Sequence, residues 1–172
     1  MQHEDFQSEQ LYLHNARQYM EEILRDSARD LKTAQDNIRT SLADLDYLDS
    51  SLSYLNILAN ARFFEMAQTQ QDSLLAVKNR PYFARIDFQR DGAAETEQLY
   101  IGKTSLFHRD THEPIIVDWR SPVANVYYDG RLGHLSYDVR GEKYSGELHK
   151  KRQYKIEAGE LLDIRDVDLT TT

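Results

Sequence analysis

The sequence predicts an α+β protein, in which a long antiparallel α-helical coiled-coil hairpin precedes a small antiparallel β-sheet or barrel-like domain. All seven Gly and all three Pro lie beyond residue 80, so residues 1–80 contain neither of the two strong helix breakers. Residues 81–172 instead hold short apolar segments separated by turn signals. We therefore expect two domains, residues 1–80 and 81–172, with a boundary near Pro81.

Mostly apolar residues recur at steps of three and four along both predicted helices, residues 8–46 and 51–79, which is typical of a heptad seam. The intervening ADLDYLDSSLS is rich in Asp and Ser, which favour turns, so we expect the reversal near residues 44–51. Half of a four-helix dimer is the alternative arrangement. The first seam contains Leu24, Ala28, Leu31, Gln35, Ile38, Leu42 and Leu45, and the second contains Leu52, Leu55, Ala59, Phe63, Met66, Gln70 and Val77.

The second half alternates apolar and polar residues over short stretches, as strands do. No helical pattern separates these stretches, which favours a small antiparallel sheet or a partly closed barrel. Strands are predicted in PYFARIDFQ, QLYIGKTSLF, IIVDW, VANVYYD, HLSYDV and YSGELHKKRQYKIE, with turns at Asp129-Gly130, Arg140-Gly141 and Ala158-Gly159.

Composition excludes several classes of function. A formal net charge of −8 argues against general affinity for nucleic acid. The absence of Cys excludes disulfides, thiolate zinc sites and Cys nucleophiles, and it fits a reducing cytoplasm. The polar N-terminus lacks the features of a secretory signal, and no apolar run is long enough for a membrane span. We expect a cytoplasmic protein with no membrane partner.

Two motifs look catalytic but lack their context. Gly102-Lys103-Thr104 spells the end of a P-loop, yet Glu97 stands where the motif needs its first Gly, and the surrounding residues are typical of a strand. His108 and His112 are four residues apart, but they lie between strands beside Pro114, so a polar hairpin loop is expected. We predict no catalytic residue and no metal site.

Three further segments give candidate site or core residues. Trp119, the only Trp, is predicted to anchor the core. The basic run HKKRQYK is either a solvated strand or a surface for an acidic partner or nucleic acid, and its candidate contacts are Lys150, Lys151, Arg152 and Tyr154. The predicted hairpin tip gathers the candidate partner-binding residues Asp44, Asp46, Tyr47, Leu48 and Asp49. Its acidic residues have two interpretations. They stabilise the N-terminus of the second helix through the helix dipole, or the long hairpin presents them at a site that only a narrow rod can reach.

Four consecutive segments carry a resemblance to a known family. PYFARIDFQ, QLYIGKTSLF, IIVDWRSPVANVYYD and GELHKKRQYKIEAGEL resemble, in order and spacing, the N-terminal part of the HelD family of UvrD/Rep-like ATPases. These bacterial helicase-type motors bind RNA polymerase and recycle it from stalled complexes. The resemblance covers residues 81 to about 166, whereas the preceding hairpin resembles the family in its architecture more than in its individual residues.

The resemblance implies a function for the hairpin. In the family, an N-terminal coiled coil enters the secondary channel of RNA polymerase, as Gre-type factors do, and its tip approaches the active site. The resemblance places ATP and Mg²⁺ in motor domains that follow, so we expect a fragment with no catalytic activity and no cofactor of its own. We expect this fragment to be a monomer that binds the RNA polymerase core, and DNA to be a possible partner only through the parent protein. Residues 1–80 carry a net charge of −5, which suits a basic channel.

Three other functions remain open at this point. The chain could be a nucleic-acid-binding accessory of an ATP-dependent DNA helicase that uses the basic strand. It could be a coiled-coil oligomerisation arm. It could also be an enzyme, and the only sequence feature that supports this alternative is the pair His108 and His112.

Overall fold

The computed structural model describes residues 3–44, 50–129 and 132–167. The chain divides into two units by its internal contacts. Gln18–Ala76 forms one unit, which we call the helical unit, and Met1–Arg17 with Val77–Thr172 forms the other, which we call the β unit. The first turns of the first helix therefore belong with the strands.

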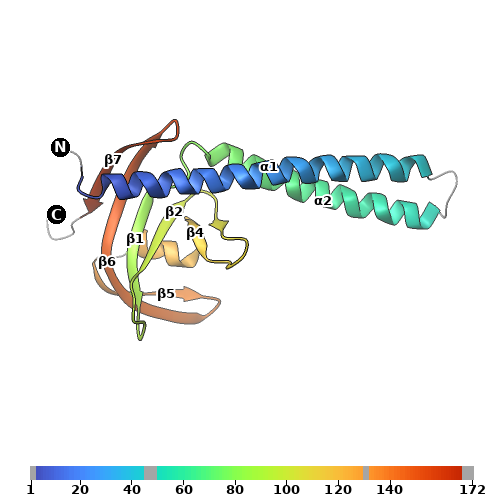
Figure 1. Cartoon of the computed structure of the whole chain (residues 1–172). Coiled ribbons are helices and arrows are strands. Elements are labelled where there is room, and N and C mark those ends of the chain that lie inside the picture. Colours follow the sequence, from blue (N-terminus) through green and yellow to red (C-terminus); the bar gives the residue numbers. More distant parts are fainter. Residues whose placement is uncertain (1–2, 45–49, 130–131, 168–172) are drawn as a thin grey trace. The chain divides into compact units, whose positions relative to one another are not determined.

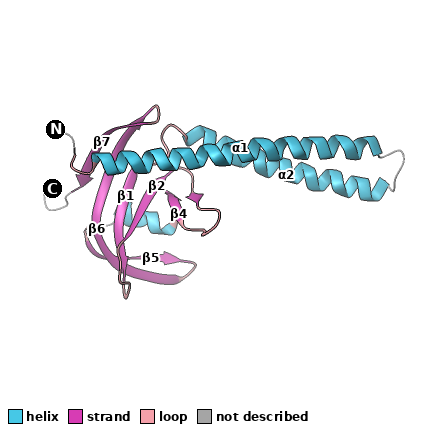
Figure 2. Ribbon diagram, in the orientation of Figure 1, coloured by secondary structure: helices cyan, strands magenta, loops and turns pink. Residues whose placement is uncertain are grey.

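Two long helices account for the first half of the chain, as predicted. Helix α1 spans Phe6–Asp44 and helix α2 spans Ser50–Val77, and both are coloured cyan in Figure 2. Their lengths of 39 and 28 residues exceed the usual three or four turns of a globular helix. Such lengths are sustained because neither segment contains Gly or Pro.

Among the described residues, seven strands form one sheet in the β unit (Figure 1). The order is β3-β4-β2-β1-β6-β5, and β7 pairs with β6 outside this path. Strands β2 and β4 run parallel, so the sheet is mixed rather than wholly antiparallel, and it is not a closed barrel among the described residues. The strands are β1 (Ala84–Arg90), β2 (Glu97–Gly102), β3 (Leu106–Phe107), β4 (Pro114–Asp118), β5 (Gly133–Val139), β6 (Glu142–Glu157) and β7 (Glu160–Val167).

Strand β1 shows how the sheet separates its two faces. Ala84, Ile86 and Phe88 are fully buried on one face, where they join an aliphatic core with residues of β2, β4, β5 and β6. Arg85 and Asp87 alternate with them and so lie on the other face. One face of the sheet is therefore apolar, and the other carries charged and aromatic side chains.

The segment VANVYYD is a short helical turn, and the strand predicted for it is wrong. It folds as a 3₁₀ turn, η1 (Pro122–Ala124), followed by helix α3 (Asn125–Asp129). Pro122 at the first helical positions and the Ser121 hydroxyl, which donates to the Asp118 carbonyl over 2.7 Å, start the turn. The alternation that suggested a strand places Ala124 and Val126 in the aliphatic core.

Candidate functional site: the helical unit and a buried cluster on the sheet

The helical unit buries or half-buries residues at heptad spacing on both helices. On α1 these positions follow steps of four and three, and small side chains at Ser27 and Ala34 allow close approach of another backbone. The Asn37 side-chain amide donates to the Asn60 side-chain carbonyl over 3.2 Å, which joins the two helices of the helical unit. The set on α1 is Ser27, Leu31, Ala34, Ile38 and Ser41, and the set on α2 is Ile57, Asn60, Phe64, Ala67, Gln71 and Leu74.

The predicted seams had the correct period but included residues that the structure exposes. On α2, Leu55, Phe63 and Met66 are 61%, 47% and 72% exposed, so the predicted second seam faces outward along most of its length. On α1, Leu42 is 54% exposed, and Ala28 and Gln35 are also exposed. The sequence favoured the more apolar rows, whereas the structure buries rows with smaller or polar members.

The predicted hairpin tip falls largely outside the described residues. Asp44 is the last residue of α1. The other tip residues, Asp46, Tyr47, Leu48 and Asp49, lie between the described ranges, so their role in partner binding stays a prediction.

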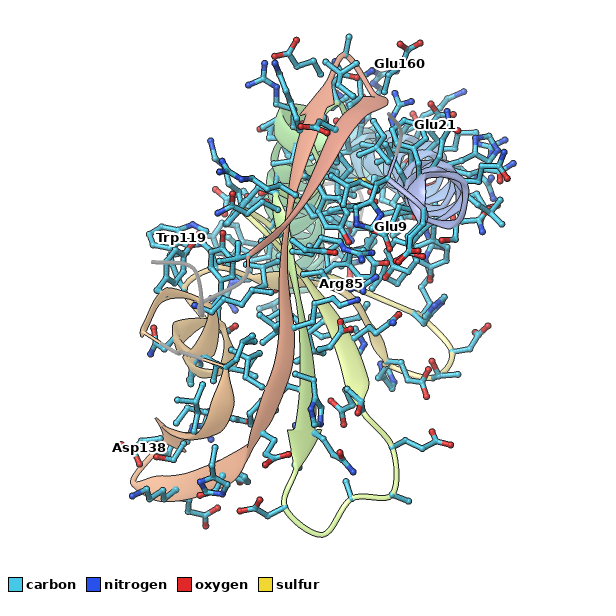
Figure 3. All side chains as sticks on the ribbon, turned by 90° about the vertical axis from the view of Figure 1, so that its left-hand side faces the viewer. Glu9, Glu21, Arg85, Trp119, Asp138 and Glu160 are labelled. Atoms are coloured by element: carbon cyan, nitrogen blue, oxygen red, sulfur yellow. The ribbon has the colours of Figure 1, made fainter. Side chains whose placement is uncertain are left out.

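A buried carboxylate fixes the first turns of α1 on the polar face of the sheet. Glu9 is 3% exposed, and its Oε1 accepts hydrogen bonds from Arg85 Nη1 over 2.6 Å and from the Tyr100 hydroxyl over 2.9 Å. Arg152 Nη1 lies 3.7 Å from the same oxygen. Figure 3 shows Glu9 and Arg85 side by side between the helix and the strands. The pair joins residues that lie far apart in the sequence, and no local pattern singled out either one.

Four tyrosines pack around this carboxylate. The Tyr12 and Tyr100 rings stack with centroids 3.7 Å apart, and Tyr82 meets Tyr154 edge to face at 5.2 Å. Burial raises the pKa of Tyr100 to about 12 and also raises the pKa values of the other three phenols, so all four stay neutral at physiological pH. The cluster is therefore a layer of neutral aromatic side chains around the charged groups of Glu9 and its arginine partners.

Three of the four candidate contacts on β6 are buried, namely Lys151, Arg152 and Tyr154, whereas His149, Gln153 and Lys155 of the same run are exposed. Arg152 is 1% exposed, and it donates to Asp166 over 2.6 Å and to Asp5 over 2.8 Å. Lys151 is buried on the opposite face with its ammonium 5.6 Å from the Tyr127 ring centroid, and Tyr154 is buried in the tyrosine layer. Only Lys150 is partly exposed, because the other three side chains have partners inside the β unit.

Trp119 is not part of the buried core that was predicted for it. Its side chain is 44% exposed and meets the Tyr128 ring edge to face at 6.4 Å. Figure 3 shows it on the side of the sheet away from Glu9. Trp119 follows the last residue of β4, where the Asp118–Arg120 ion pair of 2.8 Å holds a turn at the surface. The core is instead filled by aliphatic residues, Phe88 and Tyr137.

The motifs that resembled catalytic ones have structural roles. Glu97 and Gly102 are the two ends of β2, and Lys103 and Thr104 lie in the bend between β2 and β3, so Gly102-Lys103-Thr104 ends a strand and does not open a helix. A Cβ at Gly102 would clash with the backbone of Pro81, which is why this position is Gly. His108 and His112 close a tight turn through a backbone hydrogen bond of 2.9 Å. Within the described ranges, no group of three or more His, Asp or Glu could hold a metal ion.

The molecule is thus an α+β protein with a pair of long helices and an open mixed sheet, and none of its described helices is both long and apolar enough to cross a membrane. The family described as the N-terminal domain of DNA helicase IV HelD matches residues 6–172. The chain belongs to this family, as the resemblance of its strands indicated.

The chain was also compared with curated protein sequences and with solved structures. No curated protein sequence matches the chain. Among solved structures, the crystal structure of GreA factor homolog 1 (Gfh1) from Thermus thermophilus is similar with a TM-score of 0.33 and 14% sequence identity, covering 78% of this chain and 93% of that one. A TM-score this low does not establish a shared fold.

Proposed function

We propose that the chain is the RNA-polymerase-binding arm of a HelD-like, ATP-dependent helicase-type motor, and that it helps to release or recycle stalled polymerase. The observation that carries the proposal is the family match, which runs through both helices and the sheet from residue 6 to residue 172. On this proposal the chain binds and positions, whereas ATP and Mg²⁺ are used by the motor domains of the family.

The helical unit would act as an antiparallel coiled coil. Heptad-spaced burial on both helices and the hydrogen bond between Asn37 and Asn60 support this arrangement. At 1.5 Å per residue, the helical unit's share of each helix is on the order of 40 Å long. A pair of helices of this length fits a narrow channel that a globular domain could not enter. The family resemblance suggests that this channel is the secondary channel of the polymerase.

The tip would meet the polymerase near its active site. Asp44, Asp46 and Asp49 supply carboxylates there, and hard oxygen ligands of this kind suit Mg²⁺. The acidic balance of residues 1–80 would also speed docking into a basic channel.

Binding of the chain to bacterial core RNA polymerase, in competition with a Gre-type factor, tests the proposal. We expect mutually exclusive binding, because both proteins would occupy the secondary channel. Simultaneous binding would refute the channel assignment, and no binding where the competitor binds well would refute the arm function of this chain.

Charge reversal tests the tip separately. Replacing Asp44, Asp46 and Asp49 by Lys should weaken the competition by about tenfold, since three attractive contacts become repulsive. Asp36→Lys, an exposed reversal within α1, is the matched control. An unchanged inhibition constant for the triple variant would show that the tip carboxylates do not matter.

A further inference from the structure

Helix α2 carries a second apolar row on the side away from its buried heptad row. Leu55, Leu58, Phe63 and Met66 are 61%, 46%, 47% and 72% exposed, and the exposed Arg62 lies among them. We call these five residues the outward stripe. We propose that the outward stripe is a docking face for a protein surface that offers apolar side chains around a carboxylate. On the function proposed above, that surface lies in the wall of the polymerase channel.

The spacing of the stripe places four of its five members along one side of the helix. Positions 55, 58, 62 and 66 advance by three or four residues, so their side chains stand above one another. The buried or half-buried positions 57, 60, 64, 67, 71 and 74 advance in the same way on the other side. Phe63 follows Asn60 by three residues and precedes Ala67 by four, so it borders the inner row, whereas the other four members of the outward stripe lie on the opposite side of the helix.

Helix α2 has few charged residues for a helix whose outer side is exposed to solvent. Only Arg62, Glu65 and Asp72 are charged among the 28 residues of α2, whereas α1 has twelve charged residues among 39. A surface helix normally gives its outer side to charged and polar residues. The helical unit thus presents a charged side on α1 and an apolar side on α2.

Area and charge favour a different protein over a second copy of the chain. Four side chains at these exposures present on the order of 400 Å² of apolar surface, about half of what one partner contributes to a standard stable interface. A two-fold pairing that matches the apolar residues of two stripes would also bring Arg62 near its own copy, and like charges oppose such pairing. A carboxylate on a heterologous surface would instead pair with Arg62.

The test compares variants of the chain for binding to core RNA polymerase, measured by fluorescence anisotropy of labelled protein. Leu55→Gln combined with Met66→Gln should weaken binding about tenfold, and Arg62→Glu should weaken it several-fold. Leu75→Gln is the matched control, because Leu75 is 46% exposed on the same helix but off the stripe, and its effect should stay below twofold. Far-UV circular dichroism checks that every variant keeps its helix content.

Three outcomes would overturn the inference. If wild type binds and both stripe variants bind within twofold of it, the stripe is not the docking face, and the proposed function survives. If wild type sediments as a concentration-dependent dimer that the double variant abolishes, the occupant is a second copy. If wild type does not bind polymerase at all, the proposed function and this inference fail together.

Discussion

Replacing Glu9 by Gln should strongly destabilise the β unit. The Glu9 and Arg85 side chains are 4% and 5% exposed and 2.6 Å apart, so this substitution removes one charge from a pair that water does not reach. Gln keeps the volume of the side chain and an acceptor for the Tyr100 hydroxyl. The change therefore isolates the negative charge, with little contribution from a cavity.

The expected loss is about 3 kcal/mol in the free energy of unfolding. Breaking a buried ion pair by removing one partner typically costs roughly 3–5 kcal/mol, because the remaining charge stays buried without compensation. Arg85 keeps Asp87, whose carboxylate accepts from the guanidinium over 2.8 Å and 3.3 Å, so the loss should fall at the low end of that range. Arg152 loses a nearby charge too but retains Asp5 and Asp166.

Urea unfolding followed by the fluorescence of Trp119, the only Trp and a residue of the β unit, measures the loss. Glu21→Gln is the control, because Glu21 is exposed on the same helix and its neutralisation should change stability by less than about 0.5 kcal/mol. A loss below about 1 kcal/mol for Glu9→Gln would refute the view that this charge fixes the first turns of α1 on the sheet.

Three further changes test other parts of the fold by urea unfolding. Gly146→Ala should cost about 1–3 kcal/mol, since a Cβ there would clash with the Gln89 carbonyl and the Phe88 ring; a neutral result would contradict the close approach of β1 and β6. Burial opposes ionisation of Asp166, but hydrogen bonds from Arg152 and His3 lower its pKa to about 2, so its contribution is present above about pH 4 and is lost as pH falls through 2. Asp166→Asn should therefore cost about 1 kcal/mol at pH 7, allowing for solvent screening, and the gap from wild type should narrow toward pH 2; a constant gap would exclude this linkage. Asn60→Leu should stabilise the helical unit by about 1 kcal/mol, measured by far-UV circular dichroism, because it replaces a half-buried amide in a heptad row; destabilisation would mean that the Asn37–Asn60 bond sets the pairing of the helices.

Local periodicity was enough to predict most secondary structure. Both helices, and the strands through Ile86, Tyr100 and Ile116, lie where the sequence placed them. It could not tell a short helical turn from a strand at Val123, because each buries alternate residues over so few positions. Strand β7 was missed because ELLDIRDV alternates weakly and carries four charges.

Partners distant in sequence decided the residues that prediction placed wrongly. Arg152 looked solvent-facing because five of the seven residues of its run are basic or can become so, but Asp5 and Asp166 neutralise it from 147 and 14 positions away. Trp119 looked buried because a lone Trp usually is, yet it follows the strand end at which the chain turns outward. Neither the burial of Arg152 nor the exposure of Trp119 can be predicted from the residues next to it in the sequence.

The apolar rows of α2 show why a correct period can still give the wrong face. Leu55, Phe63 and Met66 make the more hydrophobic row, and a lone helix pair would be expected to bury it. The structure instead buries or half-buries a row in which Asn60, Ala67 and Gln71 alternate with Ile57, Phe64 and Leu74, and the corresponding row of α1 contains the small Ser27 and Ala34. Small and polar side chains fit between the apolar members of this row, where two backbones approach closely and the Asn37 amide donates to Asn60. Apolar area that the helix pair does not need for its own folding is left outward, where association with another protein can bury it.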